Sequence, residues 1–195
     1  MAPRAVVEAG EAISEASGAR LIAIDGLPVS GKSTLADLMI EALGAEVIYL
    51  DDFVKPEAEW RGRVGPAFPF HYIRYDEFLG AVQALRQNGK CSYFPYDWGT
   101  GQPSQTARAV VLDRPVIIEG VSSLHPELAP LYDLRIWVES DAESVFEASL
   151  VRGVGDWAAE WRDLFMPSVE LYLASHPQDR ADLFVKGRGY SAIPY

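Results

Sequence analysis

The sequence has only one cysteine, Cys91, among its 195 residues. A single cysteine excludes an intramolecular disulfide, so a reducing compartment, with the cytoplasm as the default, is the simpler expectation. The N-terminal stretch MAPRAVVEAGEAISEAS contains glutamates and lacks a continuous apolar core, so we expect no secretory signal there. No apolar run approaches the roughly 20 residues of a membrane-spanning helix, so we expect no membrane partner.

Positive charge is also scarce, because 17 lysines and arginines face 28 aspartates and glutamates, and the net charge is −11. Affinity for a nucleic-acid backbone comes from clustered Lys and Arg, so we expect no nucleic-acid partner. An acidic chain can still bind a triphosphate if its few positive groups converge on one site.

The chain shows no repeat, low-complexity stretch or linker, so residues 1–195 are expected to form a single domain. Buried strands are predicted at Arg20–Asp25, Glu46–Leu50, Val116–Glu119, Leu134–Val138 and Leu183–Val185, and helices at 32–43, 75–88, 141–151 and 159–174. Strands that alternate with helices imply parallel βαβ units. The predicted fold class is therefore α/β, a three-layer α/β/α P-loop NTPase sandwich with a mainly parallel sheet.

Three further segments complete this pattern. Residues 1–18 are expected to carry an amphipathic N-terminal helix over 2–17, with Val6, Val7 and Ile13 on its apolar face. That face would suit a homodimer contact or packing on the chain's own sheet, and both alternatives stay open. Residues 54–73 are rich in Pro, Gly and aromatics and predict a long ordered loop. A short strand near 91–94 is expected at the sheet edge.

The segment from Gly26 to Thr34 satisfies the pattern G-x₄-G-K-[ST] at every required position. Its glycines permit positive φ and close approach to phosphates, and successive backbone N–H groups at a helix N-terminus form an anion site. Lys32 is expected to bridge the β- and γ-phosphates, and the Ser33 hydroxyl to bind Mg²⁺. The predicted nucleotide-binding residues are Gly26, Val29, Ser30, Gly31, Lys32, Ser33 and Thr34. The alternative is a plain Gly-rich turn that caps a helix.

Carboxylates follow two predicted strands, at the edge where ligands bind in such sheets. Asp51 and Asp52 come after the second strand, and Asp51, nearer the strand end, is the better candidate to orient or deprotonate an attacking hydroxyl. Glu119 ends the third strand and suits a Mg²⁺-water ligand. The alternatives are aspartates that cap the next segment and a buried acid satisfied by amides.

Residues for an acceptor and a lid are less sharply marked. The aromatic run 93–98 could line an acceptor pocket, and Asp52, Tyr96 and Asp97 are the candidate substrate residues, although such a run can equally be core. Residues 153–161 are a candidate lid. Arg152, just before them, is the candidate to stabilise the transferred phosphoryl group.

The ordered set of Gly26–Thr34, Leu50–Phe53, Pro95–Trp98, Ile118–Gly120 and Ala181–Leu183 resembles the group of P-loop kinases that holds uridine kinase, nicotinamide riboside kinase, phosphoribulokinase and pantothenate kinase. The resemblance covers about residues 20–187 and is nearest to bacterial uridine kinase-like proteins. It implies a catalytic aspartate at Asp51, a Mg²⁺-holding residue at Glu119 and a mobile lid near Arg152. The first motif is specific for nucleotide binding, whereas the others are short.

The chain also departs from uridine kinases. The stretch after Tyr96-Asp97 lacks their nucleoside-binding histidine and arginine, and Phe70 stands where they have a ribose-binding aspartate. The predicted lid is also short and poor in arginine, since only Arg152 precedes Gly153. The resemblance therefore implies a kinase scaffold, whereas these departures count against a nucleoside as the acceptor.

These observations predict an ATP- and Mg²⁺-dependent kinase that transfers the γ-phosphoryl group to a hydroxyl of a small molecule that is nucleoside-like, sugar or vitamin-like. The alternative is an NTP-hydrolysing or nucleotide-binding regulatory protein without such an acceptor. The guanine-reading Asn-Lys-x-Asp of GTPases and the Leu-Ser-Gly-Gly signature of transporter ATPases do not occur in the sequence.

Overall fold

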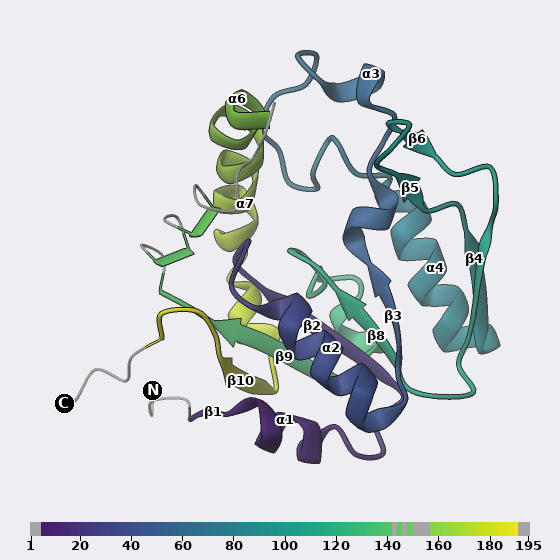
Figure 1. The fold of residues 1–195 in the computed structure, drawn as a ribbon, viewed down its shortest axis with the longest axis vertical. Helices are drawn as coiled ribbons and strands as arrows, with labels where there is room; N and C mark the ends of the chain where they lie inside the picture. Colours follow the sequence, from purple (N-terminus) through teal and green to yellow (C-terminus); the bar gives the residue numbers. More distant parts are fainter. Residues whose placement is uncertain (1–4, 142–143, 146–147, 150–156, 191–195) are drawn as a thin grey trace.

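A six-stranded parallel sheet forms the centre of the computed structural model (Figure 1), which describes residues 5–141, 144–145, 148–149 and 157–190. The strands are β1 (Val6–Val7), β2 (Leu21–Gly26), β3 (Glu46–Tyr49), β8 (Val116–Glu119), β9 (Leu134–Glu139) and β10 (Leu183–Lys186). Their order is β1-β10-β9-β2-β8-β3, and every neighbouring pair is parallel. The predicted strands are thus confirmed to within one or two residues.

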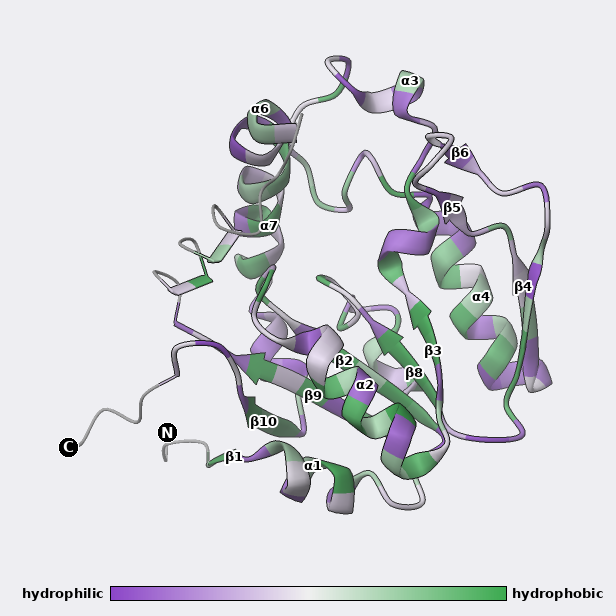
Figure 2. Ribbon diagram, in the orientation of Figure 1, coloured by the Kyte–Doolittle hydropathy of each residue, from purple (hydrophilic) through white to green (hydrophobic). Residues whose placement is uncertain are grey.

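Helices cover both faces of the sheet. The side chains of β2 alternate between the two faces, as a period of two requires. Leu21 and Ala23 pack with helices α4 (Tyr75–Asn88) and α7 (Met166–Leu173), whereas Ile22 and Ile24 pack with α1 (Ala9–Glu15) and α2 (Lys32–Leu43). The core strands are hydrophobic and α4 is amphipathic (Figure 2). The predicted three-layer α/β/α class is confirmed.

The N-terminal segment differs from the prediction. Val6 and Val7 form the edge strand β1, which pairs in parallel with Phe184 and Val185, and the helix begins only at Ala9. The prediction of one helix over 2–17 is therefore wrong at its start. Paired valines suit a strand because their branched side chains are restricted in a helix, and the exposed edge of β10 supplies the hydrogen-bonding partner.

The short strand near 91–94 does not join the main sheet. It is β4 (Lys90–Tyr93) and pairs antiparallel with β7 (Arg108–Val111). Between them a second ribbon joins β5 (Tyr96–Asp97) to β6 (Gln102–Pro103). The expectation of a strand at the main sheet's edge is wrong, because β4 finds its partner in β7, across the intervening ribbon.

The remaining segments are short helices and connections. The loop after β3 begins with a 3₁₀ helix at Leu50–Phe53 and includes α3 (Glu57–Trp60), while α6 (Ala158–Glu160) continues through a π-helical turn at Trp161–Phe165 into α7. Further 3₁₀ turns lie at Ala129–Leu131 and Pro177–Arg180. Of the predicted helix 141–151, the structure describes residues 144–145 and 148–149 as helical. Within the described chain, no helix combines the length and apolarity needed to cross a membrane.

Candidate active site

A cavity of about 760 Å³ lies at the carboxyl ends of the central strands. Its walls include the loop 28–34 before and at the start of α2, Asp51 just after β3, and Glu119 at the end of β8. Ligands of parallel α/β sheets bind at this edge, because strand ends and helix N-termini meet there. We call the side formed by loop 28–34, Asp51 and Glu119 the phosphate end.

The loop before α2 has the backbone of an anion-binding turn. Gly26 and Gly31 have φ of 151° and 109°, and Val29 has φ of 59°, an uncommon conformation for a β-branched residue. A Cβ on Gly26 would lie 2.7 Å from the carbonyl oxygen of Val138. Such strain persists where the surrounding structure imposes it and clusters at ligand-binding sites.

Lys32 and Ser33 project from the first turn of α2 into the cavity. The Lys32 side chain is 6% exposed, and its ammonium group donates to the carbonyl oxygen of Leu27 at 2.7 Å. The Ser33 hydroxyl donates to Glu119 at 3.2 Å. Burial raises the pKa of Glu119, and Asp51 raises it further, while Lys32 and the Ser33 hydrogen bond lower it. The loop and the two strand-end acids therefore form one electrostatic unit.

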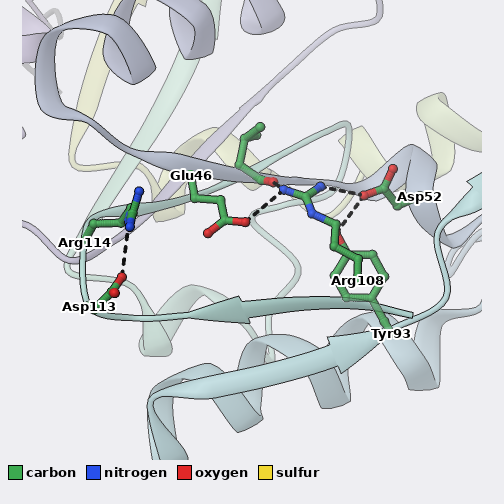
Figure 3. Close-up of polar contacts among 7 residues, drawn as sticks. Glu46, Asp52, Tyr93, Arg108, Asp113 and Arg114 are labelled. Carbon is green, nitrogen blue, oxygen red and sulfur yellow. Dashed lines mark hydrogen bonds and ion pairs between the residues drawn. The ribbon is translucent and has the colours of Figure 1, made fainter. Parts of the chain in front are cut away.

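The two neighbouring aspartates point to different environments. Asp51 lines the cavity together with Lys32 and Glu119. Asp52 accepts a hydrogen bond from the Tyr93 hydroxyl at 2.8 Å and lies 3.4 Å from the guanidinium group of Arg108 (Figure 3). Asp52 therefore joins β3 to the β4–β7 ribbon and lies outside the described lining of the cavity. Of the two aspartates, Asp51 is therefore the one that faces the cavity.

Asp25, which sequence reasoning missed, supports the phosphate end from beneath. Its fully buried carboxylate accepts hydrogen bonds from the backbone N–H groups of Gly26, Ser122 and Leu124 and from the Tyr172 hydroxyl. Burial raises the pKa of Asp25, although the hydrogen bonds from Tyr172, Leu124 and Gly26 oppose the rise. The signal was present in the sequence as an acid within an apolar strand, directly before the glycine-rich loop.

Arg188 is a second residue that sequence reasoning missed. It follows β10, and its backbone N–H and Nε donate to the carbonyl oxygens of Ser30 and Val29 at 2.8 and 3.0 Å. It also lines the cavity. A Cβ on the preceding residue, Gly187, would lie 2.7 Å from the Ser30 oxygen, so glycine permits this close approach. No local motif marked Arg188, because the contact depends on where β10 ends.

The predicted acceptor and lid residues are placed differently. Tyr96 is 6% exposed and Asp97 accepts from the N–H of Gly99 at 2.8 Å, and neither belongs to the described lining of the cavity. Their neighbour Trp98 does line it. Arg152 and positions 153–156 of the candidate lid lie outside the described residues.

Aromatic side chains form another part of the cavity wall. We call this the aromatic end, and it comprises Trp60, Phe70, Tyr72, Trp98, Trp157, Trp161 and Phe165. The rings of Trp60 and Trp157 are stacked with centroids 5.0 Å apart, and Tyr72 and Phe165 meet edge-on at 4.7 Å. Sequence reasoning missed most of this set, because its members come from three separate segments.

No protein-family model matches the chain. A curated relative is the tRNA-specific adenosine deaminase subunit tad2 of Schizosaccharomyces pombe, 26% identical over 192 residues. The match covers 91% of this chain but only 45% of that protein, so the chain spans less than half of its relative's length.

Solved structures with a similar fold are kinases of the group that the motifs resemble. A possible uridine kinase from Bacillus stearothermophilus has a TM-score of 0.69 and 19% identity, over 91% of this chain and 96% of that one. A candidate fructose transport system kinase from Silicibacter sp. TM1040 has a TM-score of 0.59 and 27% identity, over 85% and 88%. Phosphoribulokinase from Rhodobacter spheroides has a TM-score of 0.62 and 13% identity, over 86% and 70%. The chain therefore has the fold of small-molecule P-loop kinases.

Proposed function

We propose that the protein is an ATP- and Mg²⁺-dependent kinase that phosphorylates a hydroxyl group of a small molecule. The observation that carries this proposal is the convergence of Lys32, Ser33, Asp51 and Glu119 on one cavity at the carboxyl end of the sheet. Nucleotide binding alone needs the lysine and the loop, whereas a hydroxyl acceptor also needs an acid that faces it. Asp51 supplies that acid.

Each residue has a distinct role in this proposal. Lys32 and the loop N–H groups bind the β- and γ-phosphates and stabilise their charge during transfer. Asp51 orients the acceptor hydroxyl and accepts its proton. Asp25 acts through others, because it holds the backbone of Gly26 and Ser122 in place. Arg152 is proposed to approach the transferred group from the lid.

The phosphate end fits a bound Mg²⁺. Ser33 and Glu119 present oxygen atoms, the ligands that Mg²⁺ prefers, and lie 3.2 Å apart. Within the described ranges no group of three His, Cys, Asp or Glu side chains could hold a metal by itself. This suits an ion that takes most of its ligands from water and nucleotide phosphates. When bound, Mg²⁺ would neutralise charge on the phosphates.

The test is Mg²⁺-dependent ADP release from ATP by the purified chain, measured against nucleosides, sugars, vitamins and amino-alcohols. Release that depends on an acceptor and disappears in Lys32→Ala supports the proposal. ATP binding without stimulation by any acceptor would instead favour a hydrolase or a regulatory nucleotide-binding protein. Repeating the assay with GTP in place of ATP determines which nucleotide is preferred.

The expected partners are a nucleoside triphosphate and the acceptor, and the proposed location is the cytoplasm. A homodimer through the N-terminal region also stays a proposal. With Val6 and Val7 in the sheet and Ala12 and Ala16 packed against α2, the apolar face of this region is largely used within the chain. Sedimentation of the purified chain tests the oligomeric state.

A further inference from the structure

The aromatic end adds to the cavity an apolar surface that binding the nucleotide phosphates does not require. Four of the chain's five tryptophans line the cavity, on segments that precede α4, follow β5 or run into α7. Trp60 is 1% exposed, whereas Trp98 is 61% exposed. Trp98 thus presents an indole face at the edge of a buried aromatic cluster, and a ligand that covered it would remove apolar surface from water.

The rings of this end form a preorganised wall. Trp60 and Trp157 lie nearly parallel, at 28°, and the Trp98 ring meets Trp157 at 65° with centroids 6.4 Å apart. Phe70 and Tyr72 stack at 5.4 Å with an angle of 6°. Offset-stacked and edge-to-face geometries are those in which aromatic rings attract each other, so a further flat ring would find favourable faces and edges here.

Few groups of the aromatic end can bind the hydroxyls of a sugar. The indole N–H of Trp60 already donates to the carbonyl oxygen of Lys55 at 3.0 Å. Among the other aromatic-end side chains that the structure describes, only the Tyr72 hydroxyl and the remaining indole N–H groups are polar. The indole N–H groups can only donate, so the Tyr72 hydroxyl is the acceptor among these side chains. A ligand with several hydroxyls would leave some of its hydroxyl protons buried without an acceptor, which lowers affinity.

Charge also discriminates between acceptors. The cationic side chains in the described lining are Lys32 and Arg188, and both lie at the loop that would bind the nucleotide. Within the described aromatic end, a carboxylate or phosphate on the acceptor would meet aromatic faces, which carry partial negative charge. An anionic acceptor is therefore disfavoured at this end.

We propose that the acceptor is a neutral alcohol whose hydroxyl group is attached to a flat aromatic ring through a carbon atom; this rests on the proposed kinase function. The ring packs at the aromatic end, and the hydroxyl reaches Asp51. The acceptor oxygen forms a bond to the γ-phosphorus while the bond to the bridging oxygen breaks, and ADP leaves with that electron pair. The hydroxyl proton passes to the Asp51 carboxylate.

The test compares acceptors at one concentration of ATP and Mg²⁺. Benzyl alcohol and 3-hydroxymethylpyridine represent the proposed class, and uridine, D-fructose and D-glycerate represent a nucleoside, a sugar and an anion. The expected kcat/KM for the aromatic alcohols exceeds that of the other three by about tenfold or more. Tryptophan fluorescence with a non-hydrolysable ATP analogue reports binding separately, since four of five tryptophans line the cavity.

A matched pair of variants ties the preference to this surface. Trp98→Ala is expected to raise the KM for benzyl alcohol about tenfold and to leave the KM for ATP unchanged. Phe94→Ala is the control, because Phe94 is 47% exposed and lies outside the described lining of the cavity. Both side chains are exposed, so neither variant is expected to lose its fold.

The outcomes separate this inference from the proposed function. Faster transfer to uridine, D-fructose or D-glycerate than to the aromatic alcohols would overturn the inference and leave the kinase function standing. An unchanged acceptor KM in Trp98→Ala would also overturn it. ADP release that no acceptor stimulates would overturn the proposed function and this inference together.

Discussion

The phosphate end of the cavity is built from one contiguous loop and two strand ends, whereas the aromatic end gathers rings from three segments that are far apart in the chain. At the phosphate end a few charged groups act through hydrogen bonds of defined geometry, such as Lys32 to Leu27 and Ser33 to Glu119. At the aromatic end the attraction is spread over many ring contacts, such as Trp60 with Trp157.

This difference predicts two kinds of sensitivity. No neighbouring side chain can replace a charged group at the phosphate end, so its loss should abolish the step of the reaction in which it takes part. A ring at the aromatic end shares its contacts with its neighbours, so its loss should weaken binding by degrees. The four predictions below compare the two ends, from the largest expected effect to the smallest.

Lys32→Ala is expected to lower kcat/KM for ATP by about 10³-fold or more, because it removes the buried cation of the phosphate end. Steady-state ADP release measures the effect. Lys90→Ala is the control, since Lys90 is an exposed lysine at the start of β4. Retention of about a tenth of the activity in Lys32→Ala would contradict the assigned role.

Asp51→Asn is expected to lower kcat by about 10² to 10⁴-fold while ATP binding is kept, because the amide cannot accept the hydroxyl proton. Asp52→Asn is the matched control. It should chiefly lower thermal stability, because Asp52 is bound to Tyr93 and Arg108. Measurements of turnover and of nucleotide binding in both variants show which aspartate accepts the proton. A larger loss of kcat in Asp52→Asn than in Asp51→Asn would assign that role to Asp52.

Asp25→Ala is expected to lower the free energy of unfolding by about 3 kcal/mol, because three backbone N–H groups and a tyrosine hydroxyl lose their buried acceptor. Urea denaturation measures this change. Asp113→Ala serves as the control, since that side chain is 61% exposed and pairs with Arg114 at the surface (Figure 3). Equal stabilities of the two variants would refute the supporting role of Asp25.

Arg61→Ala is expected to raise the acceptor KM by about threefold and to leave kcat nearly unchanged. The Arg61 guanidinium lies 5.1 Å from the centre of the Trp157 ring and binds Glu57 and Glu160, so it joins α3 to α6 beside the aromatic end. Arg114→Ala is the control at a remote surface pair. A fall of kcat as large as in Asp51→Asn would erase the proposed difference between the two ends.

Most strands and helices could be predicted because their signals are local. The apolar run of β2, the glycine-rich loop and the spacing of α2 lie within neighbouring residues, and the resulting fold resembles the kinases that the motifs predicted. The errors arose where pairing decided the structure. Val6 and Val7 form a strand because they pair with the edge of β10. β4 lies outside the main sheet because it pairs with β7.

The phosphate end is therefore determined largely by the sequence itself, since consecutive N–H groups, positive φ angles and the Lys32 side chain all belong to one short segment. Tertiary structure alone decided that Asp52 pairs with Tyr93 and Arg108, that Arg188 reaches the loop, and that distant tryptophans meet. The physical reason is that backbone conformation follows from adjacent residues, whereas the meeting of distant side chains depends on how the layers pack.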